Sequence, residues 1–288
     1  MSETIDQTVD ALGPIHSEGH ASSPDPTPND PPWGTPAAVG TWLFSVAMIM
    51  IVPAIFLIPY AISQNSVYAD SAELMKALGS DPAAIAIQIA AIIPAHLLTL
   101  AAAWLVVTRG RTFPFFKTLG WKTGGMKWWH YLAIMAAFFL LSVVVGSLLP
   151  EQDNDLLRIL RSSRYVVFLV ALMATVTAPL VEEVIYRGLL YSALQRSVGV
   201  KAAVAIVTIL FAAVHLPQYW PSVSTMILLT TLSLTLTLVR VRTDNLLPCF
   251  ILHTIFNGAQ SLLFILGPYI GLESTAEDTV SSLVHFLK

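Results

Sequence analysis

Two adjacent glutamates, Glu182 and Glu183, lie in an otherwise apolar run from Ala178 to Leu190. Ionisable side chains at membrane depth are costly and normally face a protein interior or a wet cavity, so this pair indicates a functional site. On a helix, Glu183 and Arg187 are four residues apart and share a face, where they can form an ion pair. Glu182 is rotated by about 100° from Glu183 and has no cation on its own face. A buried carboxylate without a cation can accept a proton, which predicts Glu182 as a general base.

Three further polar side chains, His215, His253 and Asn257, lie in the apolar runs that follow. A helical rise of about 1.5 Å per residue puts Glu182, His215 and Asn257 roughly 18–21 Å from one membrane face. The same rise puts His253 roughly 12 Å from that face, on the same side of its helix as Asn257. A carboxylate beside an imidazole can take a proton from water, and a second imidazole and an amide can donate hydrogen bonds to an oxyanion. The four side chains therefore predict acyl transfer to water without a covalent nucleophile.

The same residues allow two other interpretations. Polar side chains between membrane helices can simply fix helix packing through hydrogen bonds. Two histidines and one carboxylate are also a known metal-ligand set. However, the sequence lacks the His-Glu-x-x-His string of helix-borne zinc hydrolases, the Gly-x-Ser-x-Gly string of serine hydrolases and an Asp pair within an apolar run. We therefore expect no metal and no other cofactor.

The elements that must position these residues are membrane helices. Hydrophobic residues make up 55% of the 288 residues and charged residues 11%, against about 45–50% and 25% in soluble domains. Seven apolar segments each approach the ~20 residues that cross a bilayer as a helix. They are residues 39–62, 83–107, 129–149, 165–194, 201–216, 222–239 and 246–266. The sequence thus predicts an all-α, polytopic transmembrane helix bundle of about seven helices.

Two details of these segments bear on the site. The fifth segment is expected to stop at Pro217, because proline disrupts a helix. In the second segment, His96 and Gln88 are interpreted as packing residues or as hydrogen-bond links between helices.

Residues 1–36 are rich in proline and carry six acidic residues and no Lys or Arg. Such a segment buries too little apolar surface to offset its ordering entropy. We therefore predict a disordered acidic tail over residues 1–36 and a transmembrane domain over residues 37–288. The net charge of −3 argues against a nucleic-acid partner, and the single cysteine, Cys249, cannot form an intrachain disulfide.

Basic residues gather in three connections, residues 109–127, 196–201 and 240–242. All three fall on one side of the membrane if the helices alternate. Since cytoplasmic loops carry an excess of Lys and Arg, we assign that side to the cytoplasm, with the amino terminus inside and the carboxyl terminus outside.

Three strings occur in order on separate predicted helices: Glu-Glu-x-x-x-Arg from Glu182, Phe-x-x-x-His ending at His215, and His-x-x-x-Asn from His253. They resemble the signature of the CPBP family of intramembrane proteases. That family includes the type II CAAX prenyl endopeptidases and the bacteriocin-immunity-type Abi proteins. The resemblance covers residues 165–266, and because family members often have eight spans, it makes eight the alternative helix count.

The resemblance implies a glutamate-dependent, metal-independent endopeptidase. Glu182 would activate the water with help from His215, and His253 and Asn257 would form the oxyanion site. Glu183 and Arg187 would support the site by holding in place the helix that carries Glu182.

The leading hypothesis is an intramembrane endopeptidase that cuts a peptide or membrane-protein substrate in the bilayer of a bacterial plasma membrane. A non-proteolytic membrane scaffold or bacteriocin-immunity-type protein of the same fold is the alternative. A proton-coupled transporter is a third possibility, but the internal repeats that many transporter folds carry are not visible in the sequence. The complete set of four polar residues favours the enzyme, because a scaffold needs none of them.

Overall fold

The structure is a computed structural model that describes residues 25–64, 70–149 and 152–269 of the chain. Within these ranges every regular element is a helix and no strand occurs, so the all-α prediction is confirmed. Residues 1–24 of the predicted tail and residues 270–288 of the predicted membrane domain lie outside the described part.

Seven helices of the described ranges are long and apolar enough to cross a bilayer, which agrees with the predicted count. They are α1 (Thr35–Gln64), α3 (Pro82–Thr108), α5 (Trp128–Leu148), the continuous helix Arg164–Val198, α10 (Val200–Tyr219), α11 (Val223–Thr243) and α12 (Leu247–Leu266). The ends of these helices lie within a few residues of the predicted ones. The protein is therefore a multi-pass integral membrane protein built as a helix bundle.

The helix Arg164–Val198 changes its winding along its length. It consists of α7 (Arg164–Leu172), the π-helical η1 (Met173–Thr177), α8 (Ala178–Glu182), the π-helical η2 (Glu183–Leu190) and α9 (Tyr191–Val198). The short helices are α2 (Ser71–Leu78), α4 (Phe115–Leu119), α6 (Asp155–Ser162) and the 3₁₀ turn η3 (Gly267–Tyr269).

The prediction that the fifth segment stops at Pro217 is wrong. Helix α10 runs through Pro217 to Tyr219. A proline removes one backbone hydrogen bond, and neighbouring helices in a membrane bundle can compensate for that loss.

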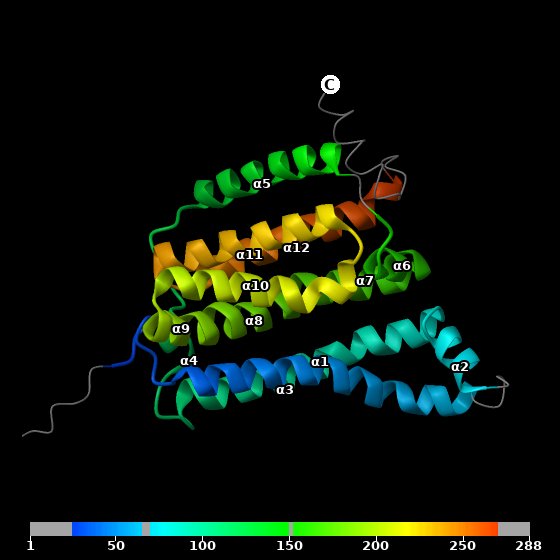
Figure 1. The fold of residues 1–288 in the computed structure, drawn as a ribbon, viewed down its shortest axis with the longest axis horizontal. Coiled ribbons are helices and arrows are strands. Elements are labelled where there is room, and N and C mark those ends of the chain that lie inside the picture. Colours follow the sequence, from blue (N-terminus) through cyan, green and yellow to red (C-terminus); the bar gives the residue numbers. More distant parts are fainter. Residues whose placement is uncertain (1–24, 65–69, 150–151, 270–288) are drawn as a thin grey trace, which may run out of the picture.

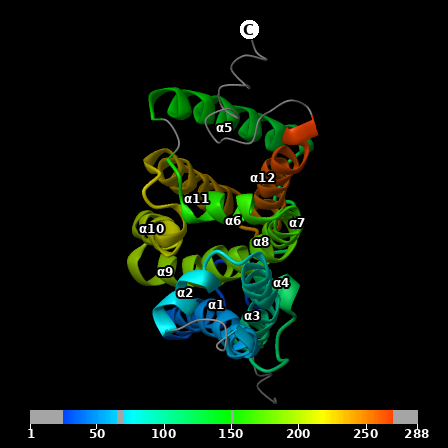
Figure 2. The ribbon, with the colours of Figure 1, turned by 90° about the vertical axis from the view of Figure 1, so that its right-hand side faces the viewer.

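The long helices lie roughly side by side and form layers (Figures 1 and 2). Helices α1 and α3 pack against each other at one side of the bundle, and α5 lies at the opposite side against α11. Between these two sides lie the helix Arg164–Val198 and α10, followed by α11 and α12. The helix that carries the glutamate pair is therefore central, with helices packed on both sides of it.

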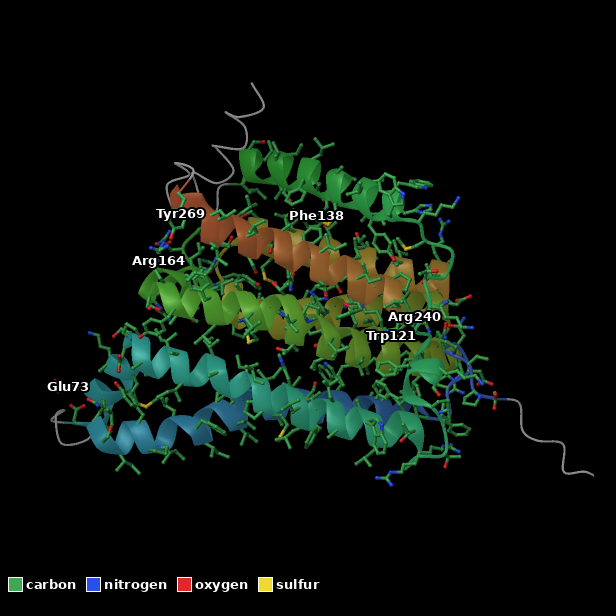
Figure 3. The ribbon with its side chains drawn as sticks, turned by 180° about the vertical axis from the view of Figure 1, so that it is seen from behind. Glu73, Trp121, Phe138, Arg164, Arg240 and Tyr269 are labelled. Atoms are coloured by element: carbon green, nitrogen blue, oxygen red, sulfur yellow. The ribbon has the colours of Figure 1, made fainter. Side chains whose placement is uncertain are left out.

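The two ends of the bundle differ in their residues (Figure 3). Trp121 and Arg240 lie at one end, and Glu73, Arg164 and Tyr269 lie at the other. The first end gathers the connection between α3 and α5, the turn between α9 and α10, and the turn between α11 and α12. These are the three basic connections, so the alternation that the orientation prediction requires is present.

Many large apolar side chains point away from the bundle. Examples are Met50, Ile62 and Leu140, which are 70%, 69% and 65% exposed. Such an extended apolar exterior would aggregate in water, whereas lipid tails cover it without cost. The outer surface therefore supports placement in a bilayer.

Residues 25–34, called the N-terminal strap below, differ from the expectation of a disordered tail. They lie across the end of the bundle and lead into α1. Trp33 is 5% exposed and donates its Nε1–H to the carbonyl of Leu189 at 3.2 Å. The carbonyl of Pro28 accepts a hydrogen bond of 2.7 Å from Arg240 Nη2.

Exposed ion pairs add to these buried contacts and help to hold a segment whose composition is that of a disordered tail. Asp25 pairs with Lys117 at 2.7 Å, and Asp30 pairs with Arg196 at 2.8 Å. The hydrogen bond from Lys117 holds the pKa of the Asp25 carboxyl below its usual range. Composition alone treats the segment as isolated and cannot include the basic surface on which it lies.

Candidate active site

The π-helical turn before the glutamate pair contains one backbone carbonyl that the local sequence leaves without a backbone donor. In a π-helical turn, each N–H bonds the carbonyl five residues earlier. At the end of η1 the N–H of Ala178 bonds the carbonyl of Met173 in this way. One residue further on, the pattern would join Ala174 to Pro179, and proline has no N–H to donate. The carbonyl of Ala174 therefore needs a donor from elsewhere.

Asn257 of α12 supplies that donor. Its Nδ2 donates to the carbonyl of Ala174 at 2.8 Å, which uses one of the two N–H groups of the amide. Among the described residues, no hydrogen bond joins Asn257 to Glu182, His215 or His253. The structure therefore leaves the predicted amide one helix turn from His253, bonded to the turn that precedes the glutamates.

Glu183 and Arg187 form the predicted ion pair. Arg187 Nη1 lies 3.0 Å from Glu183 Oε1, and the two side chains are 0% and 1% exposed. Arg187 also donates from Nη2 to the hydroxyl and carbonyl oxygens of Ser233 at 2.8 Å, and from Nε to Thr237 Oγ1 at 3.2 Å. These bonds tie the glutamate-bearing helix to α11.

Glu182 points to a different side, as the rotation between successive helix positions requires. Its side chain is 20% exposed; Oε1 lies 3.9 Å from His215 Nε2 and Oε2 lies 3.7 Å from His253 Nε2. Both distances exceed the roughly 3.2 Å limit of a direct N–H···O hydrogen bond. Within the described part of the chain, no Lys or Arg pairs with this carboxylate. Three of the four predicted catalytic side chains are thus brought together from three separate helical elements.

Hydrogen bonds at Nδ1 define the orientation and tautomer of both histidines. His215 Nδ1 lies 2.7 Å from the carbonyl oxygen of Phe211, and His253 Nδ1 lies 2.8 Å from Glu183 Oε1. A carbonyl and a carboxylate accept but do not donate, so Nδ1 carries the proton in both rings. In their neutral forms, both rings therefore turn the lone pair of Nε2 toward Glu182.

The ring of Phe211 accounts for the spacing of the Phe-x-x-x-His string. It is 1% exposed, and its centroid lies 4.7 Å from that of His215 and 6.1 Å from that of His253. The guanidinium of Arg187 lies 4.8 Å from the same centroid. Phe211 thus packs both imidazoles and makes a cation–π contact with the buried arginine.

A third histidine contacts the helix that carries the glutamates, although no sequence motif linked the two. His96 of α3 is 4% exposed, and its Nδ1 lies 3.0 Å from Thr177 Oγ1. The available signal was an ionisable side chain in an apolar run, which also marked Glu182. Without knowledge of how α3 packs, that signal could not connect His96 to η1.

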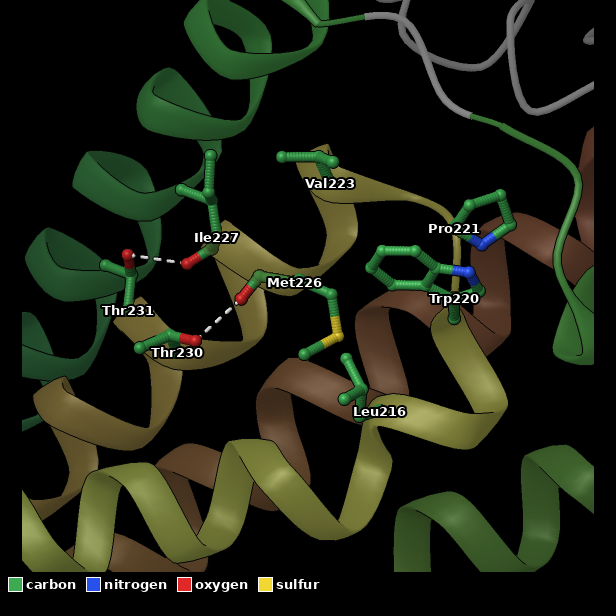
Figure 4. A pocket seen from close by; sticks show the side chains of 8 residues that line it. All are labelled: Leu216, Trp220, Pro221, Val223, Met226, Ile227, Thr230 and Thr231. Carbon is green, nitrogen blue, oxygen red and sulfur yellow. Dashed lines mark hydrogen bonds between the residues drawn. The ribbon is translucent and has the colours of Figure 1, made fainter.

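A pocket of about 430 Å³ lies where α10 turns into α11 (Figure 4). Its lining residues are Leu216, Trp220, Pro221, Val223, Met226, Ile227, Thr230 and Thr231. The hydroxyls of Thr230 and Thr231 donate to carbonyls of their own helix, at 2.7 and 2.9 Å, so the lining presents mainly apolar groups. The pocket begins one residue after His215, but neither glutamate lines it.

The site contains side chains of the types that bind metal ions. Within the described ranges, no three His, Cys, Asp or Glu side chains are arranged so that they could hold one metal ion. Glu182, His215 and His253 include the right donor types, but the positions of their donor atoms do not meet this condition. We therefore derive no chemical step through a metal.

Taken together, the fold and this cluster define a class: a polytopic membrane protein whose bundle interior holds a carboxylate facing two imidazoles. Residues 164–259, about a third of the chain, match the family model described as type II CAAX prenyl endopeptidase Rce1-like. The predicted resemblance is confirmed: at the family level, this segment is similar to CAAX-protease-like intramembrane endopeptidases. Searches of curated proteins and of solved structures gave no match.

Proposed function

We propose that this protein is an intramembrane endopeptidase in which Glu182 activates a water molecule to cleave a peptide bond. One observation carries the proposal: the Glu182 carboxylate faces two imidazole Nε2 atoms at 3.9 and 3.7 Å, while the adjacent Glu183 takes up the buried cation. A purely structural carboxylate would gain more from direct hydrogen bonds. Because neither separation is a direct hydrogen bond, the carboxylate and both Nε2 atoms keep hydrogen-bonding capacity for a water molecule beside them.

The proposed reaction needs one general base and one oxyanion site. Glu182 takes a proton from water, the resulting hydroxide attacks the carbonyl carbon, and Glu182 passes the proton to the leaving amine. His215 orients the water through Nε2. This division of work uses no covalent intermediate.

The oxyanion of the tetrahedral intermediate would be stabilised by His253 and Asn257. A protonated His253 keeps its Nδ1–H on Glu183 and offers Nε2–H to the oxyanion. The amide of Asn257 has one N–H beyond the one it gives to Ala174. Glu183 and Arg187 support the site by positioning His253 and the helix that carries Glu182.

The substrate would be a peptide or membrane-protein segment that reaches the site from the bilayer or the cytoplasm. We propose a bacterial plasma membrane as the location. The family description makes prenylated CAAX peptides the first probe to test. A non-proteolytic scaffold or immunity protein of the same fold is the competing proposal, and it predicts no hydrolysis.

The test is hydrolysis of internally quenched peptides by the purified protein in proteoliposomes, with a farnesylated CAAX peptide among them. We expect wild-type cleavage with oxygen from labelled water in the new carboxylate. Glu182→Gln should lower kcat by about 10²- to 10⁴-fold, the usual contribution of a general base. Glu73→Gln is the control, because Glu73 lies in an exposed turn of α2 at the bundle end. If Glu182→Gln cleaves as fast as wild type at equal membrane levels, Glu182 is not the base.

A further inference from the structure

His96 is held in one orientation by the helix that carries the glutamate pair. Its Nδ1 lies 3.0 Å from Thr177 Oγ1, and the Thr177 hydroxyl lies 3.3 Å from the carbonyl of Met173, to which it donates. Because the hydroxyl proton is used on that carbonyl, Thr177 accepts at His96, and His96 Nδ1 is the donor. A donor and an acceptor are thus matched across two helices at a side chain that is 4% exposed.

The partner of His96 is close to the proposed base along the chain. Thr177 is the last residue of η1, and Glu182 is the last residue of α8, which follows directly. Helix α3 packs against η1, α8 and η2. His96 nevertheless lies outside residues 164–259, the segment that matches the family model.

The opposite side of η1 is held by α12. The amide of Asn257 donates to the carbonyl of Ala174, and Thr175 Oγ1 lies 3.3 Å from Ser261 Oγ. A π-helical turn departs from the favoured α-helical winding, so it persists where surrounding contacts support it. Between α3 and α12, η1 has such contacts on both sides.

We propose that His96 is a positioning residue for the peptidase site. Its Nδ1–H, through the hydroxyl of Thr177, fixes the π-helical turn η1 and so sets where Glu182 stands relative to His215 and His253. His96 itself touches neither water nor substrate in this role. Misplacing a catalytic group by about 1 Å can cost about 100-fold in rate, which makes a remote hydrogen bond of this kind matter.

The test compares variants that break the bond with variants that keep it. His96→Leu and Thr177→Val remove it, whereas His96→Asn retains an N–H near the position of Nδ1 and Thr177→Ser retains the hydroxyl. Gln88→Leu is the matched control, because Gln88 lies on the same helix and its amide bonds the carbonyl of Ala84 at 3.3 Å. Two readouts are used: kcat and KM on the farnesylated CAAX peptide, and hydrogen exchange of the backbone over residues 173–182.

Both bond-breaking variants should raise exchange over residues 173–182 and lower kcat by about 10- to 100-fold, with KM unchanged. Their double variant should be no worse than either single one, because they remove the same interaction. His96→Asn, Thr177→Ser and Gln88→Leu should behave like wild type in both readouts.

The inference rests on the proposed function, but the exchange measurement does not need activity. If wild type cleaves no peptide, the proposed function fails, while the exchange comparison still decides whether His96 holds η1. The inference is overturned if backbone hydrogen exchange over residues 173–182 is the same in His96→Leu as in wild type. A loss of kcat that is equally large in His96→Asn also overturns it, because the ring rather than the bond to Thr177 would then be responsible.

Discussion

Two arginines are fully buried in this bundle, and their surroundings differ in one decisive respect. Arg187 has a carboxylate partner, Glu183, at 3.0 Å, and all three of its guanidinium nitrogens donate to protein oxygens. Arg240 has hydrogen bonds only from Nη2, to Pro28 and Ser192, and stacks on the ring of Tyr191 at 5.4 Å. Its Nε and Nη1 have no hydrogen-bond partner within the described part of the chain. Replacing Arg187 and replacing Arg240 should therefore change the stability of the protein by different amounts.

Arg187→Met leaves the Glu183 carboxylate buried without its cation, and we expect a loss of about 3–5 kcal/mol in stability. Arg240→Met removes a buried cation that forms no ion pair with a carboxylate of the described ranges and two of whose guanidinium nitrogens have no hydrogen-bond partner there, so a change of about 1 kcal/mol or less is expected. Thermal unfolding of both variants in the same detergent measures the difference. Equal losses in the two variants would contradict this assignment of roles.

Cleavage by this protein should not depend on a bound metal ion. The Nε2 atoms of His215 and His253 face Glu182, yet these groups are not arranged to share one metal ion in the described structure. We expect cleavage to persist after treatment with a strong chelator and dialysis. Complete loss of cleavage that added zinc restores would instead assign these three side chains as metal ligands.

At the scale of elements, the approach of the connection before α5 to the end of α11 depends on one glycine of an adjacent pair. Gly124 and Gly125 both have positive φ, +57° and +82°. A Cβ on Gly124 would lie 2.6 Å from Thr243 Cβ and 2.8 Å from the Thr243 carbonyl oxygen, whereas a Cβ on Gly125 would meet nothing within 4 Å. An alanine at Gly125 would therefore add backbone strain alone, whereas an alanine at Gly124 would add backbone strain and a steric clash.

Gly125→Ala should cost about 1–2 kcal/mol, the strain of a left-handed conformation in a residue with a Cβ. Gly124→Ala should cost about 1–3 kcal/mol more, because the connection must move away from α11. Thermal unfolding of the two variants in one detergent gives the difference directly. If Gly125→Ala is as destabilising as Gly124→Ala, the contact with Thr243 contributes nothing.

Helix positions could be predicted from the sequence because hydropathy and the bilayer thickness together determine them. The prediction brought Glu182, His215 and His253 to one region by counting helical rise, and in the structure the Nε2 atom of each histidine lies within 4 Å of a Glu182 carboxylate oxygen. The relative direction of two side chains around a helix axis was also predictable where both lie on the same helix, as for Glu183 and Arg187.

Contacts between helices could not be predicted in the same way. The bond of Asn257 to Ala174 depends on the π-helical turn and on Pro179, and hydropathy carries no trace of either. The contact between His96 and Thr177 could be predicted only from knowledge of how α3 packs against η1. The position of residues 25–34 against the bundle was not predictable from composition, because a composition rule does not include the helices on which the segment lies.

At the scale of the whole molecule, the basic connections lie at one end of the bundle and the strap covers part of that end. The connection of residues 109–127 alone carries five Lys or Arg and no acid. The excess of basic residues in short cytoplasmic loops sets membrane orientation, so this end should face the cytoplasm. Glu73 lies at the other end of the bundle (Figure 3).

Cysteine labelling tests this orientation in a bacterial host. In a Cys249→Ser background, a maleimide that does not cross membranes should label Glu73→Cys in intact spheroplasts and Lys122→Cys only after lysis. Both positions are exposed, so accessibility within the protein does not decide the result. The parent with Cys249 is a control for background labelling, because that thiol is buried. Labelling of Lys122→Cys before lysis would reverse the orientation and place the strap, with the basic connections beneath it, outside the cell.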